Sequence, residues 1–301
     1  MVAKKTKMEI GLIDVDSHNF PNLALMKLSA YHKERGDQVE WWNGLKHYDL
    51  VYCSKVFDET YSKDMEFVIN ADEVIKGGTG YDLRNELHYE VEHHYPDYEL
   101  YGRGGGTAYG FLTRGCPRGC PFCIVKEKEG NTHTVAELEE FWRGQKEIVL
   151  LDPNITASKD CEKHFDSLIK SKAKVNFSQG LDIRFMTDKA ADQLNQIRGR
   201  LVHFAWDNYE FDTYEKLRRF RPLLKKDKRN LIVYVLTNFN TTHEQDLERI
   251  YKLRELDYTP YVMIYDKPHA PKQTRLLQRW CNNRIIFRTV DRFEDYDNRL
   301  G

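Results

Sequence analysis

Blocks of apolar residues along the first eighty positions predict a small α/β sheet. The run EIGLIDVD at 9–16 has the length and composition of a strand, and the segment after Pro21 repeats Leu and Met at helical spacing. Proline suits the first turn of a helix, and Gly36 suits its end. Further strands are predicted at 39–42, 50–56 and 73–76. A strand, a crossover helix and another strand predict parallel pairing.

A polar and aromatic stretch at 81–105 leads into a second series of strands and helices. Strands are predicted at 109–113, 148–151, 175–177, 201–205, 231–237 and 260–264. Helices are predicted at 135–145, 159–172, 188–197, 214–224, 243–256 and 273–281. Thr134 is expected to cap the first of these helices, with Glu137 completing a capping box, and a last short strand is expected at 285–287. Right-handed crossovers curl such a series into a partial parallel barrel.

The expected fold class is therefore α/β, a partial (βα)6 barrel preceded by a small Rossmann-like domain. We place the small domain at 1–95, a linker at 96–106 and the barrel at 107–301. The sequence contains no run of about 18 apolar residues, so no membrane-spanning helix is predicted. The basic and then apolar start is interrupted by Asp14 and Asp16 and lacks a cleavage site, so a cytoplasmic protein is expected.

Charge gives little indication of a partner. The chain has 46 Lys and Arg against 47 Asp and Glu, a net charge of −1, which provides no overall attraction to nucleic acid or to an anionic membrane. One stretch, KLRRFRPLLKKDKR at 216–229, is strongly basic. We favour a solvated helix and turn for it, since charge runs usually face water, and nucleic acid stays open as a minor alternative.

The six cysteines are unevenly spaced. Cys116, Cys120 and Cys123 fall within eight positions, whereas Cys53, Cys161 and Cys281 are scattered. A secreted disulfide framework is small and cysteine-dense, which this chain is not. In a reducing compartment, such a trio indicates a metal site.

The trio has the pattern C-x3-C-x2-C, directly after the first predicted barrel strand. Three thiolates on one short loop suit three irons of a cubane cluster and leave the fourth iron open for a ligand. Two other interpretations are three ordinary core cysteines and a zinc site with His133 as the fourth ligand. A charged stretch separates His133 from the trio, and a large barrel does not need zinc to fold, so we favour the cluster.

The segment FLTRGCPRGCPFC resembles the cluster loop of the radical S-adenosylmethionine (radical SAM) superfamily, and the resemblance extends over about 107–290. It implies a [4Fe–4S] cluster held by the three cysteines and S-adenosylmethionine bound at the open iron. Reductive cleavage then gives a 5′-deoxyadenosyl radical that abstracts hydrogen from a substrate, with flavodoxin or ferredoxin as electron donor. Phe122 stands where the family packs an aromatic residue near adenine.

The same resemblance suggests cofactor-binding residues at the ends of other barrel strands. The family often has Gly-Gly-Glu after the second strand; here the sequence is Leu-Asp-Pro-Asn, so Asp152 and Asn154 are only candidates. The segment SQGLDIR makes Gln179, Asp182 and Arg184 candidates for the aminoacyl or ribose groups. Further candidates are Asp207 and Asn208 for the ribose hydroxyls and Asn238 in the loop where the family's backbone contacts adenine. A helix cap or a turn is an equally good explanation for each of them taken alone.

Residues 8–95 resemble more weakly the cobalamin domain that precedes the barrel in one radical SAM class. That domain has D-x-H-x-x-G with the histidine as lower cobalt ligand; here Asp16 and His18 fit, but Pro21 replaces the glycine. The alternative, which we favour, is an abbreviated α/β domain in which Asp16 and His18 cap the helix.

The function expected is that of a single-cluster radical SAM enzyme, an oxidoreductase or transferase, with an unidentified substrate. Enzymes with auxiliary clusters, and tRNA methylthiotransferases, need more clustered cysteines than this chain has. Two alternatives remain: a cobalamin-dependent radical SAM methyltransferase, and, from another class, a zinc-stabilised α/β binding protein.

Overall fold

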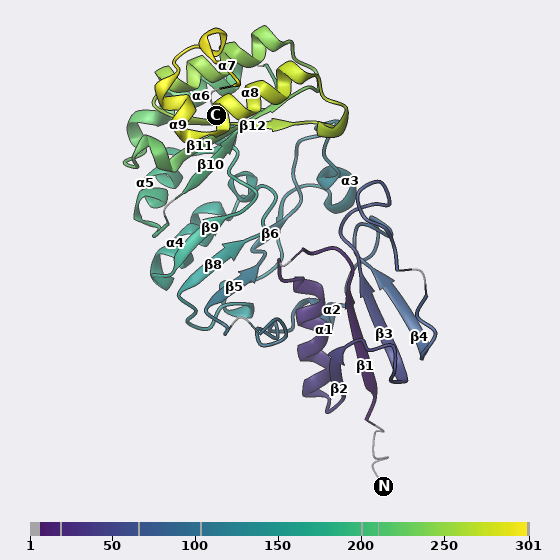
Figure 1. Cartoon of the computed structure of the whole chain (residues 1–301). Coiled ribbons are helices and arrows are strands. Elements are labelled where there is room, and N and C mark those ends of the chain that lie inside the picture. Colours follow the sequence, from purple (N-terminus) through teal and green to yellow (C-terminus); the bar gives the residue numbers. More distant parts are fainter. Residues whose placement is uncertain are drawn as a thin grey trace. The chain divides into compact units, whose positions relative to one another are not determined.

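The chain was analysed as a computed structural model that describes residues 7–18, 20–65, 67–102, 104–199, 201–209 and 211–299. It divides into two compact units (Figure 1). The N-terminal unit comprises Met1–Gly110 and Ala136–Gln145, and the C-terminal unit comprises Phe111–Val135 and Lys146–Gly301. No helix in the described part of the chain is long and apolar enough to cross a membrane.

The N-terminal unit is built on a parallel four-stranded sheet with the strand order β2-β1-β3-β4. Its strands are β1 (Glu9–Asp14), β2 (Gln38–Trp41), β3 (Tyr48–Ser54) and β4 (Ala71–Gly77). Helix α1 (Leu23–Glu34) connects β1 to β2, and the unit also contains the short helix α2 (Tyr89–Glu92) and strand β5 (Thr107–Gly110). The parallel sheet expected from the sequence is therefore present.

The two faces of this sheet are covered differently. Ile10, Leu12 and Leu50 pack with Leu25 and Leu28 of α1 in one cluster. On the opposite face the strand residues are covered by side chains from connecting segments rather than by a long helix; this cluster includes Ile13, Val51, Met65, Val68 and Tyr81. The unit is thus an abbreviated version of a sheet that has helices on both faces.

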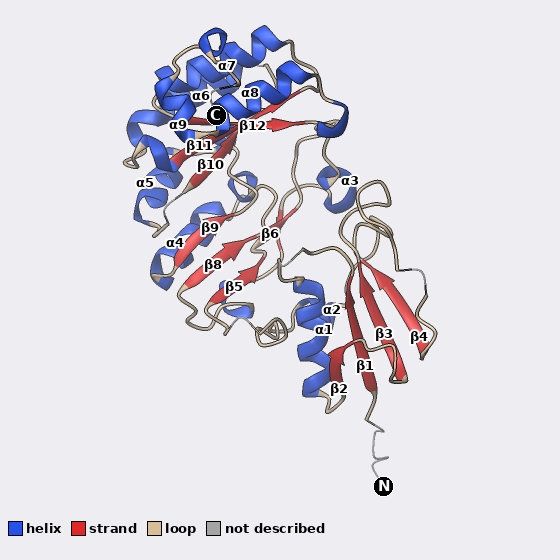
Figure 2. Cartoon of the chain, viewed as in Figure 1, coloured by secondary structure: helices blue, strands red, loops and turns tan. Residues whose placement is uncertain are grey.

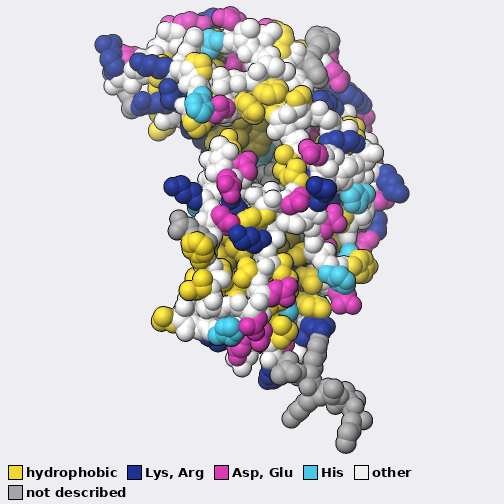
Figure 3. Space-filling view, turned by 90° about the vertical axis from the view of Figure 1, so that its right-hand side faces the viewer, with side chains coloured by type: hydrophobic (Ala, Val, Ile, Leu, Met, Phe, Trp, Pro, Cys, Tyr) yellow, Lys and Arg dark blue, Asp and Glu magenta, His cyan; other side chains and the backbone are white. Residues whose placement is uncertain are grey.

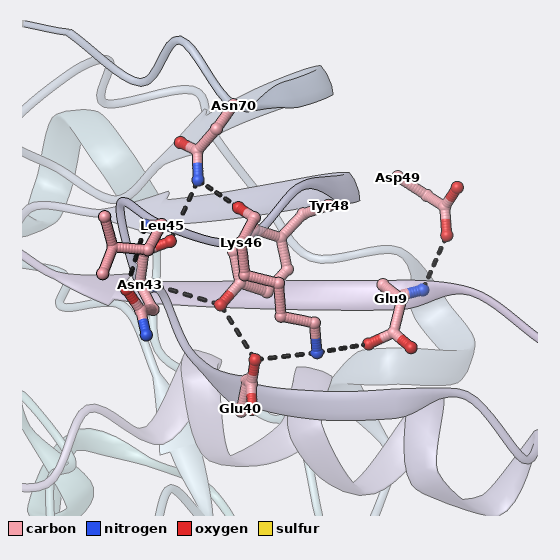
Figure 4. Close-up of polar contacts among 8 residues, drawn as sticks. All are labelled: Glu9, Glu40, Asn43, Leu45, Lys46, Tyr48, Asp49 and Asn70. Carbon is pink, nitrogen blue, oxygen red and sulfur yellow. Dashed lines mark hydrogen bonds and ion pairs between the residues drawn. The ribbon is translucent and has the colours of Figure 1, made fainter.

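Polar contacts join neighbouring strands of this sheet near their amino ends (Figure 4). The Nζ atom of Lys46 lies 2.7 Å from a carboxylate oxygen of Glu9 in β1 and 2.9 Å from one of Glu40 in β2. The hydroxyl of Tyr48 in β3 also donates to Glu40, at 2.9 Å. Exposed pairs of this kind contribute at most about 1 kcal/mol each, so their main effect is on strand register.

The start of α1 corrects one expectation from the sequence. The helix is capped by Asn22, whose side-chain oxygen accepts from the Leu25 amide at 3.2 Å. Asp16 instead accepts from the backbone amides of Val56 and Phe57, both at 2.8 Å, and His18 is exposed. The prediction that Asp16 and His18 cap α1 is wrong, because a good capping residue lies directly before the helix.

The C-terminal unit contains a series of parallel strands and helices. Its strands are β6 (Thr113–Arg114), β7 (His133–Thr134), β8 (Glu147–Leu150), β9 (Lys174–Phe177), β10 (Val202–Ala205), β11 (Leu231–Thr237) and β12 (Thr259–Ile264). Its helices are α3 (Val125–Glu129), α4 (Cys161–Ser171), α5 (Asp188–Gln196), α6 (Phe211–Phe220), α7 (His243–Glu255), α8 (Lys272–Asn282) and α9 (Arg284–Thr289).

Strands β8 to β12 of this unit form two parallel sets with helices on their outer side (Figure 2). β6 and β7 form a separate antiparallel pair. β8 pairs with β9, and β10, β11 and β12 pair in that order, all parallel. A single parallel bridge between Leu181 and Phe204 joins the two sets of strands. Helices α4 to α7 connect successive strands, and α8 follows β12. This is the open, partly closed barrel that the sequence predicts.

The predicted helix at 135–145 is absent. Residues 133–134 instead pair antiparallel with 113–114, and the Val135 amide donates to the Leu112 carbonyl at 2.9 Å. The hydroxyl of Thr134, expected to cap the helix, donates to Asp160 at 2.8 Å. Only the short 3-10 helix Leu138–Glu140 forms, with Glu137 as its cap. Pairing of this segment with the strand before the cysteine loop overrides its helical pattern.

Two strand predictions in this part of the chain also need correction. The predicted strand at 109–113 is found as β5 at Thr107–Gly110, and a separate strand, β6, begins at Thr113. The predicted strand at 285–287 is part of α9, because Asn283 caps it by accepting from the amides of Ile285 and Ile286. Phe287 of this helix then packs on Trp280.

Charged side chains of both signs are intermixed on the surface seen in Figure 3. Hydrophobic side chains also reach this face in several places. The mixture agrees with the near-zero net charge, since a strong field of one sign needs an excess of one type of charge.

Candidate metal centre

The cysteine loop leaves β6 and returns through β7, so its two ends are held together by an antiparallel pair. The Cys116 amide donates to the Gly130 carbonyl at 3.0 Å. Gly115 has φ +81°, and a Cβ atom there would lie 2.4 Å from the Asn131 carbonyl oxygen. Glycine is therefore required directly before the first cysteine.

Glu129 closes the same loop from its far end. One carboxylate oxygen accepts from the Gly115 amide at 2.9 Å, and the other accepts from the Arg114 guanidinium at 3.0 Å. The sequence pattern did not indicate a role for Glu129. Its position in a charged stretch gives no signal, because its role depends on how the loop folds back.

The three cysteines of the loop are free thiols, and the charges of Cys116 and Cys120 affect the ionisation of Cys123. The Cys123 amide donates to the Cys120 carbonyl at 3.0 Å, which turns the chain between them. Partial burial raises the pKa of the Cys123 thiol, as do the neighbouring Cys120 and Cys116. Three thiolates here repel one another unless positive charge lies among them, so this donor set fits an iron–sulfur cluster.

The zinc interpretation finds no support. His133 is exposed, and its Nδ1 atom lies 2.9 Å from the Asn131 carbonyl oxygen. Among the residues that the structure describes, which include His133 and the three cysteines, no three His, Cys, Asp or Glu side chains are grouped to hold one metal ion. A single zinc needs its ligands to converge on one point, whereas a cubane spreads its irons over separate corners.

Asp152 lies after β8 and is buried. Its carboxylate accepts from the amides of Leu112 and Thr113, at 3.2 and 2.5 Å, and from the Thr113 hydroxyl at 2.7 Å. Burial raises the pKa of Asp152 to about 6, and these hydrogen bonds oppose the shift. The structure therefore places this predicted cofactor-binding residue against the backbone that leads into the cysteine loop.

Asn154 lies next to the first cysteine. Its Nδ2 atom donates to the Cys116 sulfur at 3.3 Å, and its side-chain oxygen accepts from the Thr156 hydroxyl at 3.0 Å. The Asn154 side chain is buried. The Thr156 bond fixes the amide orientation and so aims an N–H group at the sulfur.

Asp182 and Arg184 form a two-point ion pair, with Nε–Oδ1 and Nη2–Oδ2 distances of 2.7 and 2.9 Å. Burial lowers the pKa of Arg184, but the hydrogen bonds and charge of Asp182, with further contributions from Asp207 and Cys120, raise it overall. Arg184 thus lies in the electrostatic field of a cysteine of the loop.

Asp207 follows β10 and is half-buried. Burial raises the pKa of its carboxyl group, and the positive charges of Arg184 and Arg249 oppose the shift. No described residue donates a hydrogen bond to this carboxylate. Asp207 is therefore available to accept one from a ligand, and the adjacent Asn208 is also half-buried.

The remaining candidates occupy different settings. The Phe122 ring packs edge-on against Phe239, with centroids 5.3 Å apart, and Phe239 packs against Tyr265 at 4.9 Å. Asn238 has φ +63°, and its side chain donates to the Tyr265 carbonyl at 2.8 Å. Gln179 is exposed. The structure thus brings Phe122 from the cysteine loop to the ends of β11 and β12.

Arg249 is a second residue whose role the sequence pattern did not indicate. This fully buried side chain of α7 donates to the carbonyls of Trp206 and Leu236, at 2.6 and 2.7 Å, and pairs with Asp246 at 2.6 Å. Trp206 follows β10 directly before Asp207, and Leu236 lies near the end of β11, two positions before Asn238. The position of Arg249 among the buried residues of α7 could have indicated this role, because a buried arginine needs hydrogen-bond acceptors.

Replacing Asp152 with Asn should remove a pH dependence of stability. The folded-state pKa near 6 exceeds the ordinary value of 3.8, so the folded protein binds the proton more tightly. The contribution of this group to the free energy of unfolding therefore falls by about 3 kcal/mol as the pH rises from about 4 to 6. Urea unfolding between pH 4 and 7 measures it.

In Asp152→Asn the free energy of unfolding should no longer fall between pH 4 and 6. In the control Asp192→Asn, which alters an exposed carboxyl group, the fall should remain. Identical pH profiles for wild type and Asp152→Asn would show that the buried carboxyl does not titrate in this range.

No protein-family model matches the sequence, and no curated protein does either. The fold does match solved structures of TsrM from Kitasatospora setae, a radical S-adenosylmethionine methyltransferase. The TsrM structure with cobalamin and a [4Fe-4S] cluster aligns with a TM-score of 0.66 at 12% identity, over 86% of this chain and 75% of TsrM.

A second TsrM structure, with tryptophan substrate and the SAM analogue aza-SAM, aligns with a TM-score of 0.63 at 13% identity. This alignment covers 85% of this chain and 72% of TsrM. Sequence identities this low establish similarity of fold. The chain therefore has the α/β fold of a radical SAM enzyme.

Proposed function

We propose that the chain is a radical SAM enzyme whose Cys116, Cys120 and Cys123 hold a [4Fe–4S] cluster. The observation that carries the proposal is the donor set: three thiols in one electrostatic environment, on a loop tied down at both ends, in a chain with this fold. When bound, the cluster supplies the electron that cleaves S-adenosylmethionine and so generates the radical that abstracts hydrogen from the substrate. An electron donor such as flavodoxin or ferredoxin is part of the proposal.

The chain's own residues would bind and orient S-adenosylmethionine around this loop. The Asp207 carboxylate, which accepts no hydrogen bond from a described residue, suits the ribose hydroxyls. Phe122 and Phe239 offer aromatic edges and faces to the adenine. Arg249 would act as a positioning residue, because it fixes the strand ends that carry Asp207 and Asn238.

A second candidate, a cobalamin-dependent methyltransferase, is favoured by one observation. The match to TsrM covers 86% of this chain, more than the C-terminal unit alone contains, and that TsrM structure has cobalamin bound. The N-terminal sheet reverses its strand order between β1 and β3, where ligands bind in such sheets. His18 lies exposed on the loop after β1, with φ +42°.

The same loop departs from the cobalamin motif in one respect. Both oxygens of Asp16 accept hydrogen bonds from Val56 and Phe57, so they do not orient the His18 ring. A lower cobalt ligand normally has such an outer partner. His18 therefore fits as a nitrogen donor but lacks the carboxylate that would hold it, and we keep the methyltransferase as the second candidate.

Replacing each loop cysteine with serine should abolish cluster binding. We expect about four irons per chain, with sulfide, in the anaerobically purified wild type, and 5′-deoxyadenosine when S-adenosylmethionine and a reductant are added. Cys116→Ser, Cys120→Ser and Cys123→Ser should lose most of the iron and all of the 5′-deoxyadenosine.

The matched control is Cys281→Ser, because this buried cysteine donates to the Pro260 carbonyl and serine preserves that bond. Zinc in place of iron, or 5′-deoxyadenosine formation by the loop variants, would refute the proposal.

Asn154→Ala should lower the reduction potential of the cluster. The N–H group aimed at Cys116 stabilises the extra negative charge of the reduced cluster, and its loss makes reduction harder. Spectroscopic redox titration of the purified protein measures the shift independently of turnover. Gln273→Ala, which alters an exposed side chain of α8, should leave the potential unchanged. An unchanged potential in Asn154→Ala would mean that the contact does not influence the cluster.

Corrinoid binding tests the second candidate directly. If the chain is a cobalamin-dependent methyltransferase, the protein incubated with hydroxocobalamin should retain it through gel filtration. A His18 ligand predicts a changed cobalamin absorption spectrum in His18→Ala. No retention by the wild type would eliminate this candidate and leave the cluster proposal unaffected.

A further inference from the structure

The basic stretch at 216–229 forms a helix end and a turn, and most of its cations have partners within the protein. The ion pairs are Arg218–Glu215, Arg219–Asp188, Lys228–Asp257 and Arg229–Asp227. Lys225 and Lys226, by contrast, form no ion pair with any residue that the structure describes. These two lysines belong to the segment that leads into the amino end of β11.

Segments of the same kind lead into the neighbouring strands. Residues 145–147, 170–174, 197–201 and 221–230 lead into β8, β9, β10 and β11, and they contain eleven Lys and Arg against two acidic residues, Glu147 and Asp227. Six of these cations have no ion-pair partner in the described part of the chain, and we call them the amino-edge patch: Lys146, Lys170, Lys172, Arg198, Lys225 and Lys226.

Hydrogen bonds hold the first three segments side by side. The Lys174 amide donates to the Lys146 carbonyl at 2.9 Å, and the Val175 amide donates to the Arg198 carbonyl at 2.7 Å. The Arg198 guanidinium in turn donates from Nη1 to the Lys172 carbonyl at 2.7 Å. The cations therefore belong to one continuous surface rather than to separate loops.

Lys226 joins the fourth segment to this surface. Its Nζ atom donates to the Gly199 carbonyl at 3.4 Å, and the neighbouring Lys225 amide donates to the Asn195 side chain at 2.9 Å. Lys226 is half-buried, and burial lowers the pKa of its ammonium group because no carboxylate compensates the lost hydration. An anion bound at this edge would supply the missing counter-charge.

The residue types in the patch favour one kind of partner. Five of its six cations are lysines, and none of the four segments contains Phe, Tyr, Trp or His. Protein interfaces are depleted in Lys and enriched in Arg and aromatic residues. Single-stranded nucleic acid is held largely by stacking of its bases on aromatic rings. A row of lysines without rings suits the phosphates of a duplex, which carries one negative charge per about 1.7 Å of its axis.

The patch is also wide enough for several phosphates and distant from the candidate metal centre. Four neighbouring strands extend over about 15 Å, at about 4.8 Å per strand. The seven residues of β11 separate the patch from Asn238 by about 20 Å. An electron donor has to come close to the cluster, so a partner at this edge has a different role.

We infer that the amino-edge patch binds the phosphate backbone of double-stranded nucleic acid, without regard to base sequence. The near-zero net charge of the chain is compatible with this, because salt screens charges that lie more than about 10 Å away. The inference goes beyond the proposed function and does not depend on it.

Fluorescence anisotropy of labelled duplexes tests the inference on the anaerobically purified protein. The probes are a DNA duplex and an RNA duplex of about 20 base pairs with the same sequence, which distinguish the two sources of phosphate backbone. Binding of at least one should be detectable at about 50 mM KCl and should weaken steeply and linearly, on logarithmic axes, up to about 200 mM. A duplex of scrambled sequence should bind equally well.

Lys172→Gln and Lys225→Gln should each weaken duplex binding several-fold and reduce the salt slope by about one. Each substitution removes an exposed ammonium group and leaves the backbone contacts of its segment in place. The control is Lys272→Gln, which makes the same change in an exposed lysine at the start of α8, after the carboxyl end of β12. It should alter neither the affinity nor the slope, and circular dichroism verifies that all three variants fold.

Four results would overturn the inference. The first is no binding of either duplex at the lowest salt concentration, and the second is an equal loss of affinity in Lys272→Gln. The third is tighter binding of poly-glutamate, which would assign the patch to an acidic protein. The fourth is tighter binding of phosphatidylserine vesicles, which would assign it to a membrane surface. The assay needs neither S-adenosylmethionine nor a reductant, so its failure leaves the proposed function unaffected.

Discussion

The candidate centre depends on one buried carboxylate, that of Asp152. Its oxygens accept hydrogen bonds from two backbone amides and one hydroxyl of Leu112 and Thr113, which lie four and three residues before the first cysteine. Among the described residues no cation forms an ion pair with it, so hydrogen bonds compensate its burial, and its raised pKa reflects the remaining cost. That cost is tolerated because the contact fixes where the cysteine loop leaves the sheet. The loop geometry contributed by Gly115 and Glu129 is useful only if that starting point is fixed.

Arg249 provides buried positive charge at the ends of β10 and β11, where backbone carbonyls need hydrogen-bond donors. Parallel strands that stop at the same edge leave backbone carbonyls without partners, and a buried guanidinium can serve several of them. Arg249 serves those of Trp206 and Leu236 and is neutralised by Asp246. A buried anion that accepts from amides and a buried cation that donates to carbonyls thus order neighbouring parts of one edge. Asp207 lies close enough to Arg249 to be influenced by its charge and still accepts no hydrogen bond from a described residue.

Much of the fold could be predicted because the strands of both units are short, apolar and regularly separated. The errors arose where tertiary contacts override local pattern. Residues 133–135 pair with the strand before the cysteine loop, and only a short 3-10 helix forms after them, at Leu138–Glu140. Asn283 starts a helix in a β-branched segment. In the candidate site, the spacing of the three cysteines alone was enough to predict a metal centre. The contacts of Asp152 and Asn154 were not, since the same short polar residues at a strand end suit a ligand, a turn or a neighbouring loop. Glu129 and Arg249 were missed because their partners are distant in the sequence or are backbone atoms.

Charged groups lie at both ends of the strands in the C-terminal unit. Arg184 and Asp207 lie at the carboxyl edge, where the proposed cluster and cofactor would need counter-charges. At the other end of these strands, Glu147 of β8 pairs with Lys174 of β9, and by the alternation of strand residues both lie on the same face as Val149 and Asn176. A radical that abstracts hydrogen reacts with whatever C–H bond lies nearest, so selectivity has to come from how the substrate is held. Under the proposed function, the residues that hold the substrate therefore decide the outcome as much as the residues that hold the cluster start the reaction.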